Sequence, residues 1–150
     1  MKKILIAICV AGILFSCKQT LTPIAVVKAP IDSLISNYNK AWNNHDSTAI
    51  QNLFASDALL IDDDIIAINA NEINTKWIRP YHLNISNATT IKMQEWSSNE
   101  RAGFTGNWIL DMKIKKGVIK VKGTYTMIWT KNDKGEWKIT TADLHSAPEK

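Results

Sequence analysis

The chain has 150 residues and a formal net charge of +4, and 45% of its residues are hydrophobic. Without Lys2 and Lys3, which lie in a segment that we expect to be removed, the charge falls to +2. This value is too small to indicate a protein that binds nucleic acid or a membrane through a polybasic surface. Its two cysteines, Cys9 and Cys17, lie near the N-terminus. The rest of the chain therefore has no disulfide, and about 120 residues suffice for one domain with its own core.

The N-terminal residues form a short basic and apolar segment. Lys2 and Lys3 precede an apolar run from Ile4 to Phe15, and Ser16 and Cys17 follow it. A run of about 12 residues is too short to span a bilayer, which needs about 20, and is typical of a secretory signal. The segment resembles the signal peptide of a bacterial lipoprotein.

This resemblance implies a domain organisation and a location. Residues 1–16 would be removed, Cys17 would be acylated, and 17–30 would form a tether before a domain at 31–150. Two or more acyl chains give stable membrane anchoring. We therefore expect a lipoprotein of the cell envelope that faces the periplasm and contacts the membrane through Cys17. The alternative is an ordinary secreted protein that is cleaved before Thr22.

Helical spacing begins after Pro30, which suits the first turn of a helix. Asp46 is a good N-cap for a second short helix that ends at Ser56-Asp57, before a strand at Leu59–Ile61. A third helix is predicted from Asn71, kinked or ended before Pro80. The apolar residues that carry these helices are Ile31, Leu34, Ile35, Tyr38 and Trp42, then Ile50, Leu53 and Phe54, then Ile73 and Trp77.

From Thr89 onward the pattern changes to strands, with apolar residues at alternate positions. A long antiparallel hairpin with one apolar face is predicted around a turn at Lys116-Gly117. Its apolar residues are Phe104, Trp108, Leu110, Met112 and Ile114, then Ile119, Val121, Tyr125, Met127 and Trp129. In the last strand, one face is predicted to carry Trp137, Ile139, Thr141, Asp143 and His145. Helices first and strands second indicate an α+β domain, with helices on the concave side of a curved antiparallel sheet.

The order and spacing of these elements resemble the nuclear transport factor 2-like superfamily, which includes SnoaL-like and ketosteroid-isomerase-like proteins. The resemblance covers Ile31 to Ser146. It rests on Tyr38-Asn39-Lys40-Ala41-Trp42, Asp46, Phe54-Ala55-Ser56-Asp57-Ala58, Gly123-Thr124-Tyr125 through Trp129, and Gly135-Glu136-Trp137-Lys138-Ile139. It implies a cystatin-like cone of three helices and a bent sheet around an apolar pocket, often dimeric through the outer sheet face.

The same resemblance implies candidate catalytic residues. In ketosteroid isomerases an aspartate moves a proton while a tyrosine and a protonated aspartic acid stabilise the oxyanion. Tyr38 and Asp62 match the tyrosine and the base by position, but the strand Tyr125–Trp129 carries no carboxylate. The alternatives are that Tyr38 is a core residue and that Asp62 begins a solvated turn, Asp62-Asp63-Asp64.

Asp143 and His145 form a second candidate site, because residues two apart on a strand share a face. A carboxylate beside a histidine makes the ring a plausible base. The alternative is a fraying chain end. Aromatic residues on inward faces are predicted to line the pocket together with Asp143; they are Trp42, Trp77, Trp108, Tyr125 and Trp129. No zinc-site cluster, glycine-rich phosphate loop or nucleophile elbow is present, so we expect no metal and no cofactor.

Three functions remain open from the sequence. The first is an envelope protein that binds a small apolar molecule without changing it. The second is an acid/base isomerase, dehydratase or cyclase that uses Asp62 or His145 with Tyr38. The third is a non-catalytic interaction module, a homodimer through the sheet face.

Overall fold

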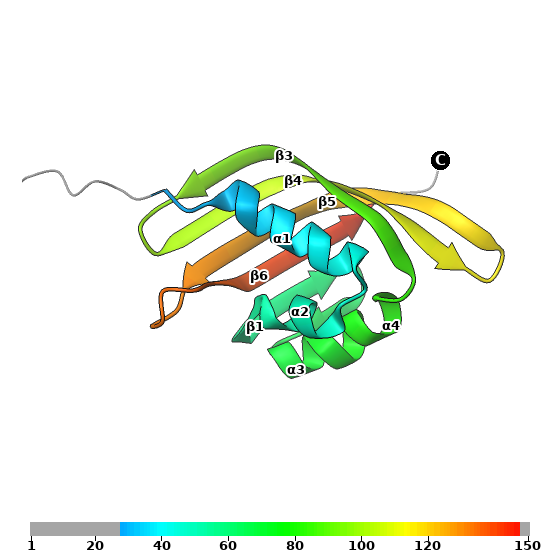
Figure 1. Cartoon of the computed structure of the whole chain (residues 1–150), viewed down its shortest axis with the longest axis horizontal. Coiled ribbons are helices and arrows are strands. Elements are labelled where there is room, and N and C mark those ends of the chain that lie inside the picture. The colour runs from blue at the N-terminus through cyan, green and yellow to red at the C-terminus, as the bar shows by residue number, and fades with distance from the viewer. Residues whose placement is uncertain (1–27, 148–150) are drawn as a thin grey trace, which may run out of the picture.

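The computed structural model describes residues 28–147, so the predicted signal peptide, Cys17 and most of the predicted tether lie outside the described residues. A helical layer covers one face of a six-stranded sheet (Figure 1). The helices are α1 (Ile31–Asn43), α2 (Ser47–Asn52), α3 (Ala70–Ile73), the π-helix η1 (Asn74–Ile78) and α4 (Arg79–Tyr81). The strands are β1 (Phe54–Asp62), β2 (Ile65–Ala67), β3 (Ile85–Ser97), β4 (Arg101–Ile114), β5 (Gly117–Lys131) and β6 (Trp137–Ser146). None of these helices is long and apolar enough to cross a membrane.

Helix α1 confirms the first predicted helix. Its apolar residues recur at three and four positions and form one buried stripe, made of Ile31, Ile35, Tyr38, Ala41 and Trp42. Asp32 in the first turn favours the helix through the macrodipole. The helix lies across the concave side of the sheet beside β3 (Figure 1). Its stripe therefore places Tyr38 and Trp42 over the sheet.

Helix α2 is shorter than predicted. The N-cap is confirmed, because Asp46 Oδ1 accepts a 2.8 Å hydrogen bond from the Ala49 N–H. However, Phe54 begins β1 instead of belonging to α2. The Ile139 N–H donates to the Leu53 carbonyl at 2.8 Å, which places the start of β1 beside β6. Periodicity over so few residues does not separate a helical turn from a strand.

The third helical segment runs without interruption through α3, η1 and α4. Asn69 caps it by accepting a 2.9 Å hydrogen bond from the Glu72 N–H. The Arg79 N–H donates to the Asn74 carbonyl five residues back, so the backbone here forms a wider π turn. Pro80 follows this turn inside α4. Of the two predicted alternatives, an end before Pro80 is therefore wrong, because the helical segment continues to Tyr81.

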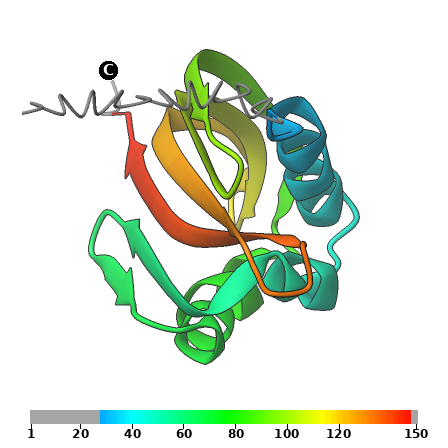
Figure 2. The same cartoon turned by 90° about the vertical axis from the view of Figure 1, so that its left-hand side faces the viewer.

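The sheet has the order β2-β1-β6-β5-β4-β3. It is mixed, because β1 and β6 run parallel while the other neighbours run antiparallel. The predicted α+β class and the curved sheet with helices on its concave side are confirmed (Figure 2). The predicted hairpin is confirmed as β4 and β5, which pair from Arg101↔Thr130 to Ile114↔Gly117. Strand β3 begins at Ile85, four residues before the predicted start at Thr89.

Strand β6 contains a bulge. Ile128 of β5 pairs with Thr141, but the next residue, Trp129, pairs with Ile139. Thr140 is therefore an extra residue in β6. A single extra residue shifts which positions face the core.

The bulge changes the face on which the end of β6 presents its side chains. After the bulge Ala142 and Leu144 are buried, whereas Asp143 is half-buried and His145 is exposed. The prediction that Asp143 and His145 continue the buried face of Ile139 is therefore wrong. Strict alternation holds only up to Thr140.

Candidate functional site

A cavity of about 520 Å³ lies between the helices and the inner face of the sheet. Most of its lining is apolar, and its volume falls within the usual range of ligand pockets. Key side chains around it are Tyr38 and Trp42 from α1, Asp62 from β1, Trp77 from η1, Trp108 from β4, Tyr125 from β5 and Leu144 from β6. Six of the lining residues are exposed and mark where the cavity opens: Asp63, Asp64, Thr89, Ile119, Ser146 and Ala147.

Asp62 lies at the end of β1, two residues beyond the buried Leu60 and therefore on the same inner face. The Trp77 indole N–H donates a 2.6 Å hydrogen bond to Asp62 Oδ2. Partial burial raises the pKa of the Asp62 carboxyl, and the charge of Asp63 raises it further. The Trp77 hydrogen bond and the charge of His145 act in the opposite direction. The net result is a carboxyl that keeps its proton to higher pH than an ordinary aspartate.

Tyr38 contributes a neutral phenol to the cavity. Burial raises its pKa well above the usual range, and Tyr125 and Asp62 act in the same direction. The nearby indole N–H of Trp42 favours the phenolate and lowers the pKa of Tyr38, but this effect is smaller than the rise caused by burial. The Tyr38 ring centroid lies 6.3 Å from that of Trp42 and 6.5 Å from that of Tyr125. The ring that carries the Tyr38 hydroxyl thus lies among other aromatic rings.

Trp42 carries an unpaired hydrogen-bond donor. Its side chain lines the cavity and the residue is only 2% exposed. Its indole N–H finds no acceptor among residues 28–147. The ring packs edge to face against Trp77, with centroids 4.8 Å apart. An unpaired buried donor costs about 1–3 kcal/mol, and such a group in a native protein is uncommon.

The hydroxyl of Tyr125 is already engaged. Thr90 donates a 3.1 Å hydrogen bond to Asn39 Oδ1, and this uses the only proton of its hydroxyl. Thr90 Oγ1 therefore accepts the hydrogen bond that joins it to the Tyr125 hydroxyl. Burial raises the pKa of Tyr125 to about 12, although the Thr90 bond opposes this rise. The chain Tyr125, Thr90 and Asn39 ties β5 and β3 to α1.

Several solved structures have the same fold as this chain. A ketosteroid isomerase-like protein from Erwinia carotovora atroseptica has a TM-score of 0.68 and 14% identity, over 79% of this chain and 95% of that chain. A nuclear transport factor 2-like superfamily protein from Salmonella enterica serovar Typhimurium has a TM-score of 0.67 and 14% identity, over 79% and 89%. An NTF2-like protein with a cystatin-like fold from Novosphingobium aromaticivorans has a TM-score of 0.62 and 11% identity, over 80% and 81%. The chain has the nuclear transport factor 2-like fold.

Identities this low establish the fold alone. No protein-family model and no curated protein matches the sequence. The predicted resemblance to the nuclear transport factor 2-like superfamily is confirmed at the level of fold. The side chains that line the cavity of this nuclear transport factor 2-like domain determine what it can bind.

Six of the residues predicted for the site line the cavity. They are Tyr38, Trp42, Asp62, Trp77, Trp108 and Tyr125. The two matched to catalytic positions, Tyr38 and Asp62, reach it from different elements, α1 and the end of β1. The charge of the Asp62 carboxyl raises the pKa of the Tyr38 hydroxyl, so the two side chains face the same part of the cavity. Their roles remain predictions.

Three predicted residues lie elsewhere in the nuclear transport factor 2-like domain. Trp129 is buried but stacks on Phe104, with centroids 5.5 Å apart, and does not line the cavity. Asp143 and His145 also lie outside its lining because the bulge turns them away. They do contact each other, with 3.2 Å between His145 Nε2 and Asp143 Oδ1.

Some features of the site were not predicted from the sequence. The Asn39–Thr90 hydrogen bond joins residues that are 51 positions apart, and no local pattern indicates it. The Trp77–Asp62 bond likewise depends on how η1 packs under β1. Residues 28–147 hold no group of three or more His, Cys, Asp or Glu side chains placed to bind a metal ion.

Proposed function

We propose that this domain binds a small, mainly apolar molecule that carries one hydrogen-bond-accepting oxygen. The cavity supports this proposal through its volume of about 520 Å³ and its aromatic and aliphatic lining. Pockets for small molecules are generally apolar with a few well-placed polar groups. Here those groups include Asp62, Tyr38 and Trp42.

The unpaired indole N–H of Trp42 is the observation that carries the proposal. It lies beside the Tyr38 hydroxyl, whose pKa it lowers, yet it has no acceptor of suitable geometry among the described residues. Both groups can donate a hydrogen bond. A ligand oxygen at this end of the cavity would supply the missing acceptor, whereas an unsubstituted hydrocarbon would leave the donor unpaired.

The first experiment is native mass spectrometry of the full chain, compared with its denatured mass. A retained small-molecule mass supports the proposal and identifies the ligand class. The matched probes 2-tetralone and tetralin, which differ by one carbonyl oxygen, then test the donor. We expect Trp42→Phe to weaken 2-tetralone binding about fivefold, the equivalent of one hydrogen bond of about 1 kcal/mol, and to leave tetralin binding unchanged.

Trp96→Phe is the matched control, because Trp96 is exposed and does not line the cavity. If Trp42→Phe binds each probe with the same affinity as the parent chain does, the role of Trp42 as hydrogen-bond donor is contradicted. If neither 2-tetralone nor tetralin binds and native mass spectrometry retains no small molecule, ligand binding itself is contradicted.

Acid/base catalysis is the second candidate, and the raised pKa of Asp62 favours it. Such a carboxyl exchanges protons nearer to neutral pH than an ordinary aspartate, which suits an isomerase, dehydratase or cyclase. The strand Tyr125–Trp129 offers no second acid, and losing one oxyanion donor commonly costs about 10²–10³ in rate. The test is deuterium exchange at the α-carbon of 2-tetralone. Acceleration by the parent chain that Asp62→Asn abolishes supports catalysis, and unchanged exchange contradicts it.

We further propose that the domain is anchored in the cell envelope through Cys17 and faces the periplasm. The support is the basic and apolar segment before Cys17, which resembles a lipoprotein signal. In bacterial cells, Cys17→Ala should leave the chain unprocessed or release it from membranes. Normal acylation of that variant would contradict the choice of cysteine.

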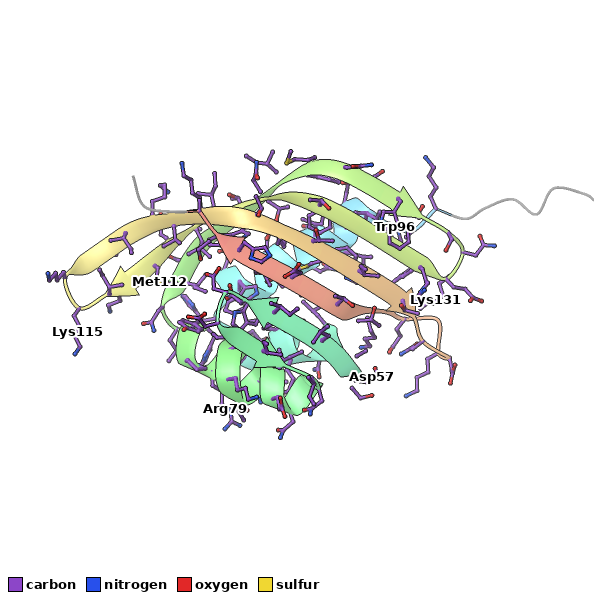
Figure 3. All side chains as sticks on the ribbon, turned by 180° about the vertical axis from the view of Figure 1, so that it is seen from behind. Asp57, Arg79, Trp96, Met112, Lys115 and Lys131 are labelled. Carbon is purple, nitrogen blue, oxygen red and sulfur yellow. The ribbon has the colours of Figure 1, made fainter. Side chains whose placement is uncertain are left out.

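A second copy of the chain is the proposed partner, through the outer face of the sheet. Ile91, Met93 and Trp96 of β3 are large apolar side chains that are each more than 45% exposed, which favours a covered surface. Trp96 projects from this side in Figure 3. Light scattering of the full chain should report a dimer that Trp96→Glu converts to a monomer. A monomeric parent chain would contradict this proposal.

A further inference from the structure

The tip of the β4–β5 hairpin, residues 113–122, is rich in positive charge. Residues 113–122 contain five lysines and no acidic residue. Of these five lysines, only Lys120 forms an ion pair with another residue in the range 28–147, with Asp111 at 2.8 Å. The other four are Lys113, Lys115, Lys116 and Lys122. The net charge of the chain is therefore modest although the surface at residues 113–122 is strongly basic.

The same hairpin exposes aliphatic side chains. Ile114 is 39% exposed, Val118 is 65% exposed and Ile119 is 38% exposed. The hairpin extends past the helical layer, so no helix covers the concave side of its tip (Figure 1). Figure 3 shows Lys115 at this tip, beyond Met112. The tip is therefore both basic and apolar.

The two kinds of side chain are partly segregated. Ile114, Met112 and Ile119 share the concave face, because Met112 pairs with Ile119 and residues two apart face the same side. Lys113, paired with Val118, lies on the opposite face. Met112 and Ile119 also line the cavity, so the apolar strip of the hairpin continues into the cavity mouth.

We propose that hairpin 113–122 is a contact site for an anionic lipid bilayer. Ile114 and Ile119 enter the interface from the concave face, while Lys115 and Lys116 at the turn contact lipid phosphates. Clusters of four or more lysines attract anionic membranes, and apolar side chains among them add burial in the interface. The hairpin contains no aromatic residue on which a base could stack, so single-stranded nucleic acid is the less suitable partner. Its location at the cavity mouth places the opening of the cavity next to the bilayer.

Vesicle binding of the full chain tests this proposal. The probes are vesicles of phosphatidylcholine alone and of phosphatidylcholine with phosphatidylglycerol. The test variant is Lys115→Gln with Lys116→Gln, and the charge-matched control is Lys40→Gln with Lys134→Gln, two exposed lysines far from the hairpin in sequence. All three chains keep the same N-terminal apolar segment, so its contribution cancels in the comparison.

At about 1 kcal/mol for each lysine near the surface, the hairpin variant should bind phosphatidylglycerol vesicles about 30-fold more weakly than the parent chain. The control should change by less than about threefold. Hydrogen exchange of the bound parent chain should slow within 113–122 on phosphatidylglycerol vesicles only. Equal losses in the two variants, no preference for phosphatidylglycerol, or lysine-dependent binding to poly(U) without vesicle binding would each overturn the proposal. Thermal unfolding of both variants confirms that they are folded.

Discussion

The indole N–H of Trp77 donates a 2.6 Å hydrogen bond to Asp62 Oδ2 inside the cavity. Trp77 comes from the π turn between α3 and α4, and Asp62 comes from the end of β1. Burial raises the pKa of Asp62, and this hydrogen bond is the largest effect that opposes the rise. Trp77 therefore influences the pH at which the Asp62 carboxyl gains or loses its charge.

Trp77→Phe should raise the pKa of Asp62 further, because it removes the donor that stabilises the carboxylate. The lost bond, to a group that can be charged, should also lower the free energy of unfolding by about 2 kcal/mol at neutral pH. Carbon-13 NMR titration of the Asp62 carboxyl in the parent chain and the variant measures the first effect. Trp96→Phe is the control. An unchanged Asp62 titration in Trp77→Phe would contradict the structural assignment.

The alkaline stability of the domain should depend on Tyr125. Its pKa is about 12 in the folded chain and 10.0 for an ordinary tyrosine, so the folded chain holds a proton that the unfolded chain loses first. The stabilisation is complete below pH 10 and is lost as the pH rises through about 12. This gives a slope of at most about 1.4 kcal/mol for each pH unit.

Tyr125→Phe should therefore flatten the fall in unfolding free energy between pH 10 and 12. Urea unfolding at several pH values measures the slope. Tyr81→Phe, on α4, serves as the control variant. Equal slopes for the parent chain and Tyr125→Phe would show that the tyrosine does not retain its proton.

Gly123→Ala should destabilise the domain strongly. A Cβ at Gly123 would lie 2.1 Å from the His145 carbonyl oxygen and 2.4 Å from the Trp108 ring. Because one of these groups is the backbone of the paired strand, the clash can be relieved only by moving β6 or the cavity wall. We expect a loss of about 3 kcal/mol or more in unfolding free energy. Thr124→Ala, at an exposed neighbouring position, should cost no more than about 1 kcal/mol.

Asp46→Ala should cost about 1 kcal/mol of unfolding free energy, because it removes the acceptor for the Ala49 N–H at the start of α2. Asp46→Asn keeps a side-chain oxygen at the cap and should retain most of the stability. Urea unfolding of the three chains measures both effects. If the two variants were equally destabilised, the carboxylate charge and not the cap hydrogen bond would be responsible.

The candidate site was only partly predictable. Tyr38 and Asp62 were assigned to one pocket through the resemblance to a known superfamily, and both line the cavity. Asp143 and His145 were assigned by simple alternation along β6, and the bulge at Thr140 turns them away from the cavity lining. The missing acceptor of Trp42 is visible only when every neighbouring side chain is in place. Hydrogen bonding of a buried group depends on distant parts of the chain.

The elements that local interactions define can be predicted from the amino-acid sequence. These are the amphipathic α1, the cap at Asp46 and the β4–β5 hairpin, whose turn joins adjacent strands. By contrast, long-range pairing makes Phe54 the start of a strand and sets β1 parallel to β6, because Phe54 pairs with Ile139, which is 85 positions away. Periodicity records which side of an element is apolar. It does not record which distant segment will satisfy the backbone hydrogen bonds of that element, and this pairing determines where the sheet curves and where the cavity forms.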